Sequence, residues 1–134
     1  MIVVDTNIIA YLWLPGEHTD LAEGVLRKNP LWAAPLLWRS EFRSVLAGYI
    51  RLKKIPLATA VHIMDEAETL LRGREYSIPS LKVLELIPES ECSAYDLEFV
   101  ALAKNLGIVL VTTDKQMIKA FPSIAVSAVK FLGA

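Results

Sequence analysis

The sequence predicts an α/β fold in which a short, mostly parallel central sheet is flanked by helices on both faces. Short apolar runs that are typical of buried strands alternate with longer segments of helical period, and Pro or Gly residues separate them. The chain has 134 residues and contains no linker, internal repeat or low-complexity segment. We therefore expect a single domain that spans residues 1–134.

The first half of the chain is expected to begin with a strand and to end with two long helices. Thr6 is the expected N-cap of the first helix, and Pro15–Gly16 and Asn29–Pro30 interrupt the helical pattern. Pro56 suits the first turn of a helix that Gly73 ends. The expected elements are the strand Ile2–Val4, the helices Ile8–Leu14 and Thr19–Lys28, the strand Leu31–Ala34, and the helices Leu36–Leu52 and Leu57–Leu71.

The second half of the chain is expected to add two strands and three helices after a brief extended piece. Ser93 is the expected N-cap of its longest helix, Gly107 ends that helix, and Phe121–Pro122 forms a turn. The expected elements are the extended piece Tyr76–Pro79, the helices Ser80–Ile87 and Ala94–Leu106, the strand Ile108–Thr112, the helix Lys115–Ala120 and the strand Ile124–Val126.

The composition excludes several classes of protein. An apolar content of 54% argues against a disordered chain. The net charge of -1 gives no general attraction to nucleic acid or membrane, so a polyanionic partner would need a local basic patch. Cys92 is the one cysteine, which excludes an intrachain disulfide and fits a reducing compartment. With neither a signal peptide nor a transmembrane stretch in the sequence, we expect a cytoplasmic protein without a membrane partner.

Two acidic residues follow predicted strands. Asp5 comes directly after the strand Ile2–Val4, and Asp114 ends the segment IVLVTTD. In open α/β sheets, ligands bind at the carboxyl ends of the strands. We therefore expect both carboxylates at the edge of the sheet where ligands bind.

Two further carboxylates lie inside helices that are otherwise apolar on the same side. At 100° per residue, Glu41 lines up with Leu37 and Val45 on the edge of an apolar stripe. Asp96 projects into the inward stripe of the helix Ala94–Leu106, whereas Glu98 points to the other side and is expected to be solvated. The pattern predicts that Glu41 and Asp96 face inward.

Four inward carboxylates would repel one another. An isolated buried carboxylate is costly, and each pair near 4 Å costs roughly 1–4 kcal/mol. Mg²⁺ or Mn²⁺, which accept oxygen ligands, would relieve this repulsion. Zinc is disfavoured because His18 and His62 lack the spacing of ligands. The structural alternatives for the single acids are a helix cap at Asp5 and ion pairs of Glu41 or Asp96 with Arg39, Arg43 or Lys104.

The order and separation of these motifs resemble those of PIN-domain ribonucleases, in particular the VapC-type toxins of toxin–antitoxin pairs. The quoted stretches are VVDTNIIAYLW, WRSEFRSVL, SAYDLEFVALAKNLG and VLVTTD. The resemblance implies a single PIN domain with Mg²⁺- or Mn²⁺-dependent endoribonuclease activity, usually dimeric and held inactive by a VapB-type antitoxin. The family's acidic positions carry over to Asp5, Glu41, Asp96 and Asp114. Its hydroxyl and amide positions carry over to Thr6, Asn7, Thr112 and Thr113.

The resemblance suggests a hydrolytic mechanism in which water is the nucleophile. Asp5 and Asp96 would hold one metal ion, with Glu41 binding it or a second ion partly through water. Asp114 would complete the second site or orient a water that the metal activates. In-line attack on RNA would leave a 5′-phosphate and a 3′-hydroxyl.

RNA would need local cations, and the chain offers few. The charge run Asp65–Glu68 is expected to be a solvated face, and Trp13, Trp32 and Trp38 are expected to pack rather than to stack on bases. The candidate RNA contacts are Arg39, Arg43, Arg51, Lys53, Lys54, Arg72, Arg74 and Lys115.

Three other functions remain open on the sequence. A metal-dependent nuclease of DNA or of structured nucleic acid would share the same acids. A nucleic-acid-binding module without catalysis would use them only structurally. A phospho-acceptor domain would need a second acid beside Asp5, but Val4 and Thr6 are its neighbours.

Overall fold

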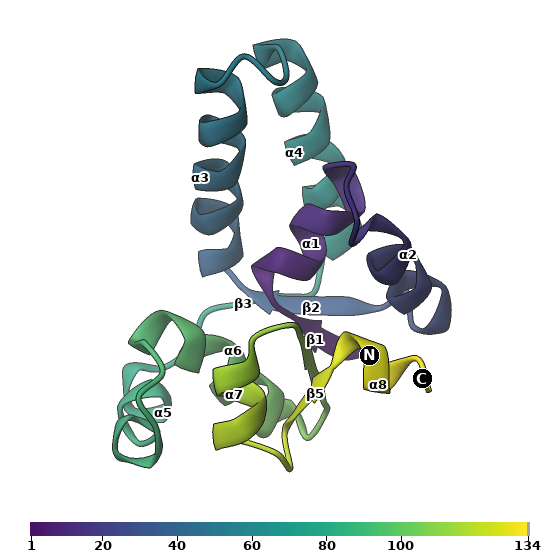
Figure 1. The fold of residues 1–134 in the computed structure, drawn as a ribbon. Coiled ribbons are helices and arrows are strands. Elements are labelled where there is room, and N and C mark those ends of the chain that lie inside the picture. The colour runs from purple at the N-terminus through teal and green to yellow at the C-terminus, as the bar shows by residue number, and fades with distance from the viewer. Residues whose placement is uncertain (134) are drawn as a thin grey trace.

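A five-stranded sheet, in the order β3-β2-β1-β4-β5, forms the centre of the molecule (Figure 1). The computed structural model describes residues 1–133. All four strand pairings are parallel, so the predicted α/β fold is confirmed. The strands are β1 (Ile2–Val4), β2 (Trp32–Pro35), β3 (Glu75–Tyr76), β4 (Leu110–Thr112) and β5 (Ala125–Ser127).

Helices cover both faces of this sheet. Helix α6 packs on β1, β2 and β4 from one side, while α1 and α2 lie together on the other side with α4 (Figure 1). Helices α3 and α4 rise away from the sheet as a hairpin, with their connection at its tip. The helices are α1 (Thr6–Trp13), α2 (Thr19–Lys28), α3 (Leu37–Arg51), α4 (Leu57–Leu71), α5 (Ser80–Leu84), α6 (Ala94–Leu106), α7 (Lys115–Ala120) and α8 (Ala128–Phe131), with a 3₁₀ turn at Ile87–Glu89.

The central strands are buried on both faces, which explains why they read as continuous apolar runs. Val3 and Val4 of β1 and Leu110 and Val111 of β4 are completely buried. Each is in register with the neighbouring strand, and Val4 pairs with Val111. The two strands therefore end side by side. Among residues 1–133, no helix has the length and apolar character needed to cross a membrane.

Besides shifts of one or two residues at the ends of several elements, local features differ from the prediction. Asp5, not Thr6, is the N-cap of α1, because the Asp5 carboxylate accepts the Ile8 amide. The helix expected over 80–87 ends at Leu84 and is followed by the 3₁₀ turn. The extended piece begins earlier, at Glu75, where pairing with β2 defines it. Helix α8 is not predicted by the sequence pattern.

Gly107 provides a test of the predicted helix end. Its φ of 67° lies in the left-handed region, and a Cβ there would meet no atom within 4 Å. Gly107→Ala should therefore cost about 1 kcal/mol of unfolding free energy through backbone strain alone. Gly48 also has open space around a Cβ but lies within α3. Gly48→Ala should stabilise by roughly 0.5–1 kcal/mol. Urea unfolding of both variants would contradict this account if the two changes had the same sign.

Candidate active site

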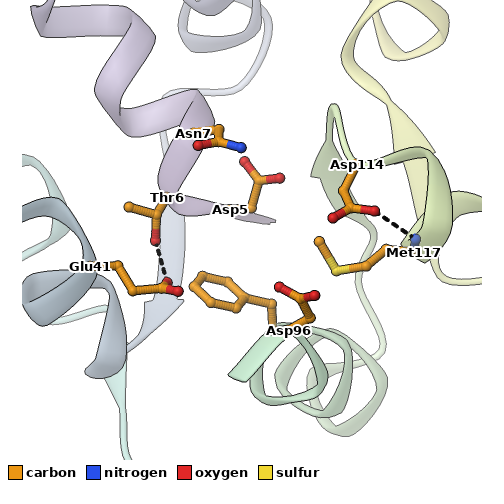
Figure 2. Close-up of a pocket in the computed structure, with 8 residues that line it drawn as sticks. Asp5, Thr6, Asn7, Glu41, Asp96, Asp114 and Met117 are labelled. Carbon is orange, nitrogen blue, oxygen red and sulfur yellow. Dashed lines mark hydrogen bonds between the residues drawn. The ribbon is translucent and has the colours of Figure 1, made fainter. Parts of the chain in front are cut away.

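The four predicted acids line one cavity (Figure 2). Asp5 follows β1, Glu41 comes from α3, Asp96 from the first turn of α6, and Asp114 from the end of the β4–α7 connection. The cavity has a volume of about 80 Å³. Its complete lining is Asp5, Thr6, Asn7, Glu41, Asp96, Phe99, Asp114 and Met117.

The sheet topology explains this convergence. Strand β1 lies between β2 and β4, so the chain leaves β1 toward one side for β2 and returns to the other side for β4. The carboxyl ends of β1 and β4 therefore border a topological switch point, where α/β sheets bind ligands. Asp5 and Asp114 stand at this point.

Asp5 is almost completely buried, with 5% of its surface exposed. Its carboxylate accepts hydrogen bonds from the Ile8 amide (3.0 Å) and the Thr112 hydroxyl. The pKa of Asp5 is raised from 3.8 to about 6: burial is the main cause and the charge of Asp114 a smaller one, and both act against the hydrogen bonds from Thr112, Ile8 and the Thr113 backbone, which lower the pKa. Asp5 thus caps α1, as the structural alternative proposed, and also lines the cavity.

Glu41 and Asp96 are half-buried and form no salt bridge with a basic residue of the described chain. The Thr6 hydroxyl donates to Glu41 Oε1 at 2.7 Å (Figure 2). Burial raises the pKa of both acids; the charge of Asp96 adds to this for Glu41, and that of Asp114 adds to it for Asp96. The ion pairs considered for these acids do not form.

Asp114 is the N-cap of α7. Its Oδ1 accepts the amides of Gln116 (2.8 Å) and Met117 (3.0 Å). Its own amide donates to the Thr112 hydroxyl at 2.9 Å, and the same hydroxyl donates to Asp5. The completely buried Thr112 thus connects two of the acids. Thr6 and Asn7 line the cavity, but Thr113 does not.

The donor set fits a hydrated, hard cation better than a closed metal cage. Within residues 1–133, no three carboxylate, histidine or cysteine side chains converge closely enough to hold an ion by themselves. One water needs roughly 10–15 Å³ of cavity volume, so about 80 Å³ accommodates a cation with several waters. Mg²⁺ keeps several of its waters and needs only one or two direct carboxylates. The four acids suit such an ion.

Several residues around the cavity were not singled out as site residues. Phe99 and Met117 form apolar walls, and helical periodicity could have found Phe99, which belongs to the inward apolar stripe of α6. Ser44 and Val45 line an adjoining hollow that shares Thr6, Asn7 and Glu41 with the cavity.

The expectation for Glu98 was wrong. Glu98 is half-buried rather than solvated, and burial and the charge of Glu41 raise its pKa.

The charged surface also differs from the expectation. Arg39 pairs with Glu68 and Glu75, and Arg74 donates to the carbonyls of Trp32 and Leu70. Protein acceptors thus occupy both guanidinium groups, which removes them from the candidate RNA contacts. The other six candidates are exposed: Arg43, Arg51, Lys53, Lys54, Arg72 and Lys115.

The run Asp65–Glu68 is more than a solvated face, because two of its acids connect helices. Glu66 accepts the indole N–H of Trp13 at 2.8 Å, and Glu68 holds Arg39. The other tryptophans, Trp32 and Trp38, are completely buried, as packing residues should be.

Comparison with known proteins identifies the family. Residues 2–121 match the sequence profile of the PIN domain, and the chain belongs to this family. The resemblance inferred from the motifs is confirmed. Ribonuclease VapC3 of Pyrobaculum aerophilum is 26% identical over 132 residues, which cover 92% of this chain and 96% of the relative.

Solved structures share the fold. PAE2754 from Pyrobaculum aerophilum superposes with a TM-score of 0.76 at 20% identity, covering 98% of this chain and 93% of that one. A toxin–antitoxin complex from Klebsiella pneumoniae superposes with a TM-score of 0.69 at 19% identity, covering 96% and 98%.

The raised pKa of Asp5 predicts how stability depends on pH. Because the folded protein binds the Asp5 proton more tightly than the unfolded chain does, metal-free protein should lose stability as pH rises from about 4 to about 6. At 1.36 kcal/mol per pKa unit, the shift corresponds to about 3 kcal/mol. Asp5→Asn should remove this loss, so that the variant exceeds wild type in stability at pH 7.

Urea unfolding in EDTA at pH 4 to 7 measures this difference. Glu91→Gln, at an exposed position, is the matched control and should keep the wild-type pH dependence. Equal pH profiles for Asp5→Asn and wild type would show that the buried carboxylate carries no such penalty.

Proposed function

We propose that this protein is a Mg²⁺- or Mn²⁺-dependent endoribonuclease and the toxin of a VapBC-type toxin–antitoxin pair, acting in the cytoplasm. The observation that carries the proposal is the single cavity where Asp5, Glu41, Asp96 and Asp114 meet without basic partners. Membership of the PIN family and the similarity to Ribonuclease VapC3 support it. The buried, unpaired thiol of Cys92 fits the reducing cytoplasm.

In this proposal Asp5 and Asp96 would hold the cation, while Glu41 and Asp114 would bind its waters or a second ion. When bound, the cation lowers the pKa of a water and offsets the charge on the leaving 3′-oxygen. Thr6 holds the Glu41 carboxylate in position, and Thr112 does the same for Asp5. The apolar walls formed by Phe99 and Met117 limit the water around the acids.

We propose that RNA lies along the hollow beside the cavity. Asn7 and Ser44 offer hydrogen-bonding groups there, and exposed Lys115 directly follows Asp114. Arg51 ends α3, ten residues beyond Glu41, which corresponds to about 15 Å along the helix axis. With Lys53 and Lys54 it makes the tip of the α3–α4 hairpin basic, so a bound RNA that extends this far would meet it.

We infer two protein partners. An antitoxin of the VapB type would use the apolar groove between α3 and α4, which Leu46, Ile50 and Met64 help to line. The structural similarity to a chain of a toxin–antitoxin complex from Klebsiella pneumoniae supports such a partner. A second copy of the chain would pack on the exposed apolar residues Leu81 and Tyr95.

Replacement of the acids tests the activity. Asp5→Asn and Glu41→Gln should each lower Mg²⁺-dependent RNA cleavage at least about 100-fold, because each removes a charge that the cation needs. The products of the wild type should carry a 5′-phosphate and a 3′-hydroxyl. Mn²⁺ should raise the melting temperature of wild type more than that of either variant.

The same assay separates the alternatives. Cleavage of DNA in place of RNA would favour a DNA nuclease. Nucleic-acid binding without cleavage would favour a binding module, and a 2′,3′-cyclic phosphate product would contradict the role of water. Glu91→Gln serves again as the exposed control.

The basic tip makes a separate prediction. If Lys53 and Lys54 contact phosphates, their joint replacement by Gln should weaken RNA binding and reduce the slope of log K against log salt by about 1–2. Lys104→Gln, an exposed change in the last turn of α6, is the control. An unchanged slope on titration of a long RNA between low and moderate salt would show that the tip does not contact the substrate.

A further inference from the structure

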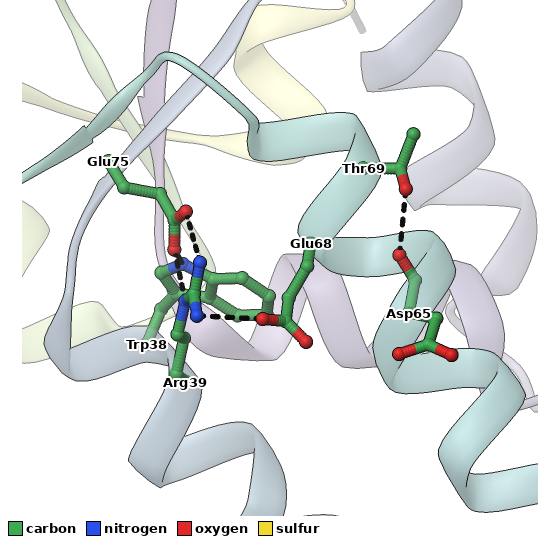
Figure 3. A network of polar contacts seen from close by, with 6 residues as sticks. All are labelled: Trp38, Arg39, Asp65, Glu68, Thr69 and Glu75. Atoms are coloured by element: carbon green, nitrogen blue, oxygen red, sulfur yellow. Dashed lines mark hydrogen bonds and ion pairs between the residues drawn. The ribbon is translucent and has the colours of Figure 1, made fainter.

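A compact polar network lies at the base of the α3–α4 hairpin, outside the acid cavity (Figure 3). Glu75 of β3 accepts the indole N–H of Trp38 at 2.7 Å and two N–H groups of Arg39, at 2.6 and 2.7 Å. Arg39 also pairs with Glu68 of α4 at 2.7 Å. These four residues, which we call the Glu75 clamp, join α3, α4 and β3.

The clamp differs from an ordinary surface ion pair. The Glu75 side chain is only 11% exposed, and Trp38 is completely buried. Two parallel N–H bonds from one guanidinium to one carboxylate give a fixed geometry, and charge-assisted bonds of this kind are stronger than neutral ones. The Arg39 hydrogen bonds hold the pKa of Glu75 below its usual range. The clamp is therefore specific in its geometry.

The clamp acts on the part of α3 that carries Glu41. Leu36 provides no side-chain cap for α3, and uncapped first turns leave amide groups without partners. Trp38 and Arg39 both belong to this first turn. Two residues further along a helix correspond to about 200°, so Glu41 leaves α3 on the side opposite Arg39. There its carboxylate meets the Thr6 hydroxyl.

We propose that Glu75 is a positioning residue for the acid cavity: through Trp38 and Arg39 it holds the first turn of α3 so that Glu41 remains beside Thr6 and within reach of the cation. The N-terminal part of α3 is thus held on two sides, because Trp38 and Arg39 contact β3 and Glu41 contacts α1. The inference rests on the proposed function in so far as Glu41 binds a divalent cation.

The chain offers a control that shares the tryptophan contact. Glu66 of α4 also accepts a tryptophan indole N–H, from Trp13 at 2.8 Å, but that contact joins the end of α1 to α4 and does not involve the first turn of α3. Glu75→Gln and Glu66→Gln each remove a negative charge that accepts an indole N–H, although Glu66 is half-exposed and pairs with His62 instead of an arginine. Only Glu75→Gln should disturb Glu41.

The test measures Mn²⁺ binding by calorimetry and amide hydrogen exchange in the metal-free protein. Glu75→Gln should weaken Mn²⁺ binding about tenfold, the lower end of the effect of residues that support metal ligands. Exchange should accelerate at residues 41–43, the first amides of α3 with hydrogen-bond partners inside the helix, and stay unchanged at residues 46–50. Glu66→Gln should match wild type in both measurements. Arg39→Lys serves as a second variant if Glu75→Gln unfolds the protein. It keeps the positive charge but cannot make the two parallel N–H bonds to Glu75, so it should weaken Mn²⁺ binding in the same direction but less strongly.

A double variant checks that the effect passes through the clamp. Arg39→Gln combined with Glu75→Gln should bind Mn²⁺ no more weakly than the worse single variant. If wild type binds Mn²⁺ and all clamp variants bind it equally well, the positioning role is wrong while the proposed function stands. If wild type binds no Mn²⁺, both are overturned.

Discussion

The burial of the Asp5 carboxylate is the constraint on which the site depends. β1 is the central strand of the sheet, so the residue that follows it enters the interior and not the solvent. Its hydrogen bonds offset only part of the desolvation, which is why its pKa remains high. The carboxylates of Asp96 and Asp114 lie around the same cavity and add negative charge. A cation bound there would complete the charge balance of this arrangement.

Helix ends make the arrangement possible in the absence of an ion. Asp5 caps α1, Asp114 caps α7, and Asp96 lies in the first turn of α6. The amide groups at a helix N-terminus carry partial positive charge and favour carboxylates. The structural and chemical interpretations of Asp5 therefore do not compete, because one carboxylate oxygen accepts an amide while the group as a whole borders the cavity.

Much of this organisation was readable from local pattern. Val4 and Val111 lie in continuous apolar runs because their strands are covered on both faces, and the acids that follow those runs were assigned to the sheet edge on that basis. The prediction that Glu98 is solvated was wrong. A helical wheel places a residue only relative to its own helix, so it contains no information about Glu41 of α3, whose charge acts on Glu98. The predicted extended piece began one residue too late, at Tyr76. Glu75 is not a residue type that favours strands, and only its pairing with β2 makes it part of β3.

The sequence by itself determined the parallel α/β fold, the inward direction of Glu41 and Asp96, and the PIN family, because periodicity, chain breakers and motif order are properties of neighbouring residues. Only the tertiary structure decided which charged side chains are paired within the protein and which remain available to a ligand. It joined Arg39 to Glu75 across 36 positions of the chain and left Glu41 with the Thr6 hydroxyl, 35 positions away. Partners so far apart in the chain are set by the packing of helices on the sheet, which no local pattern encodes.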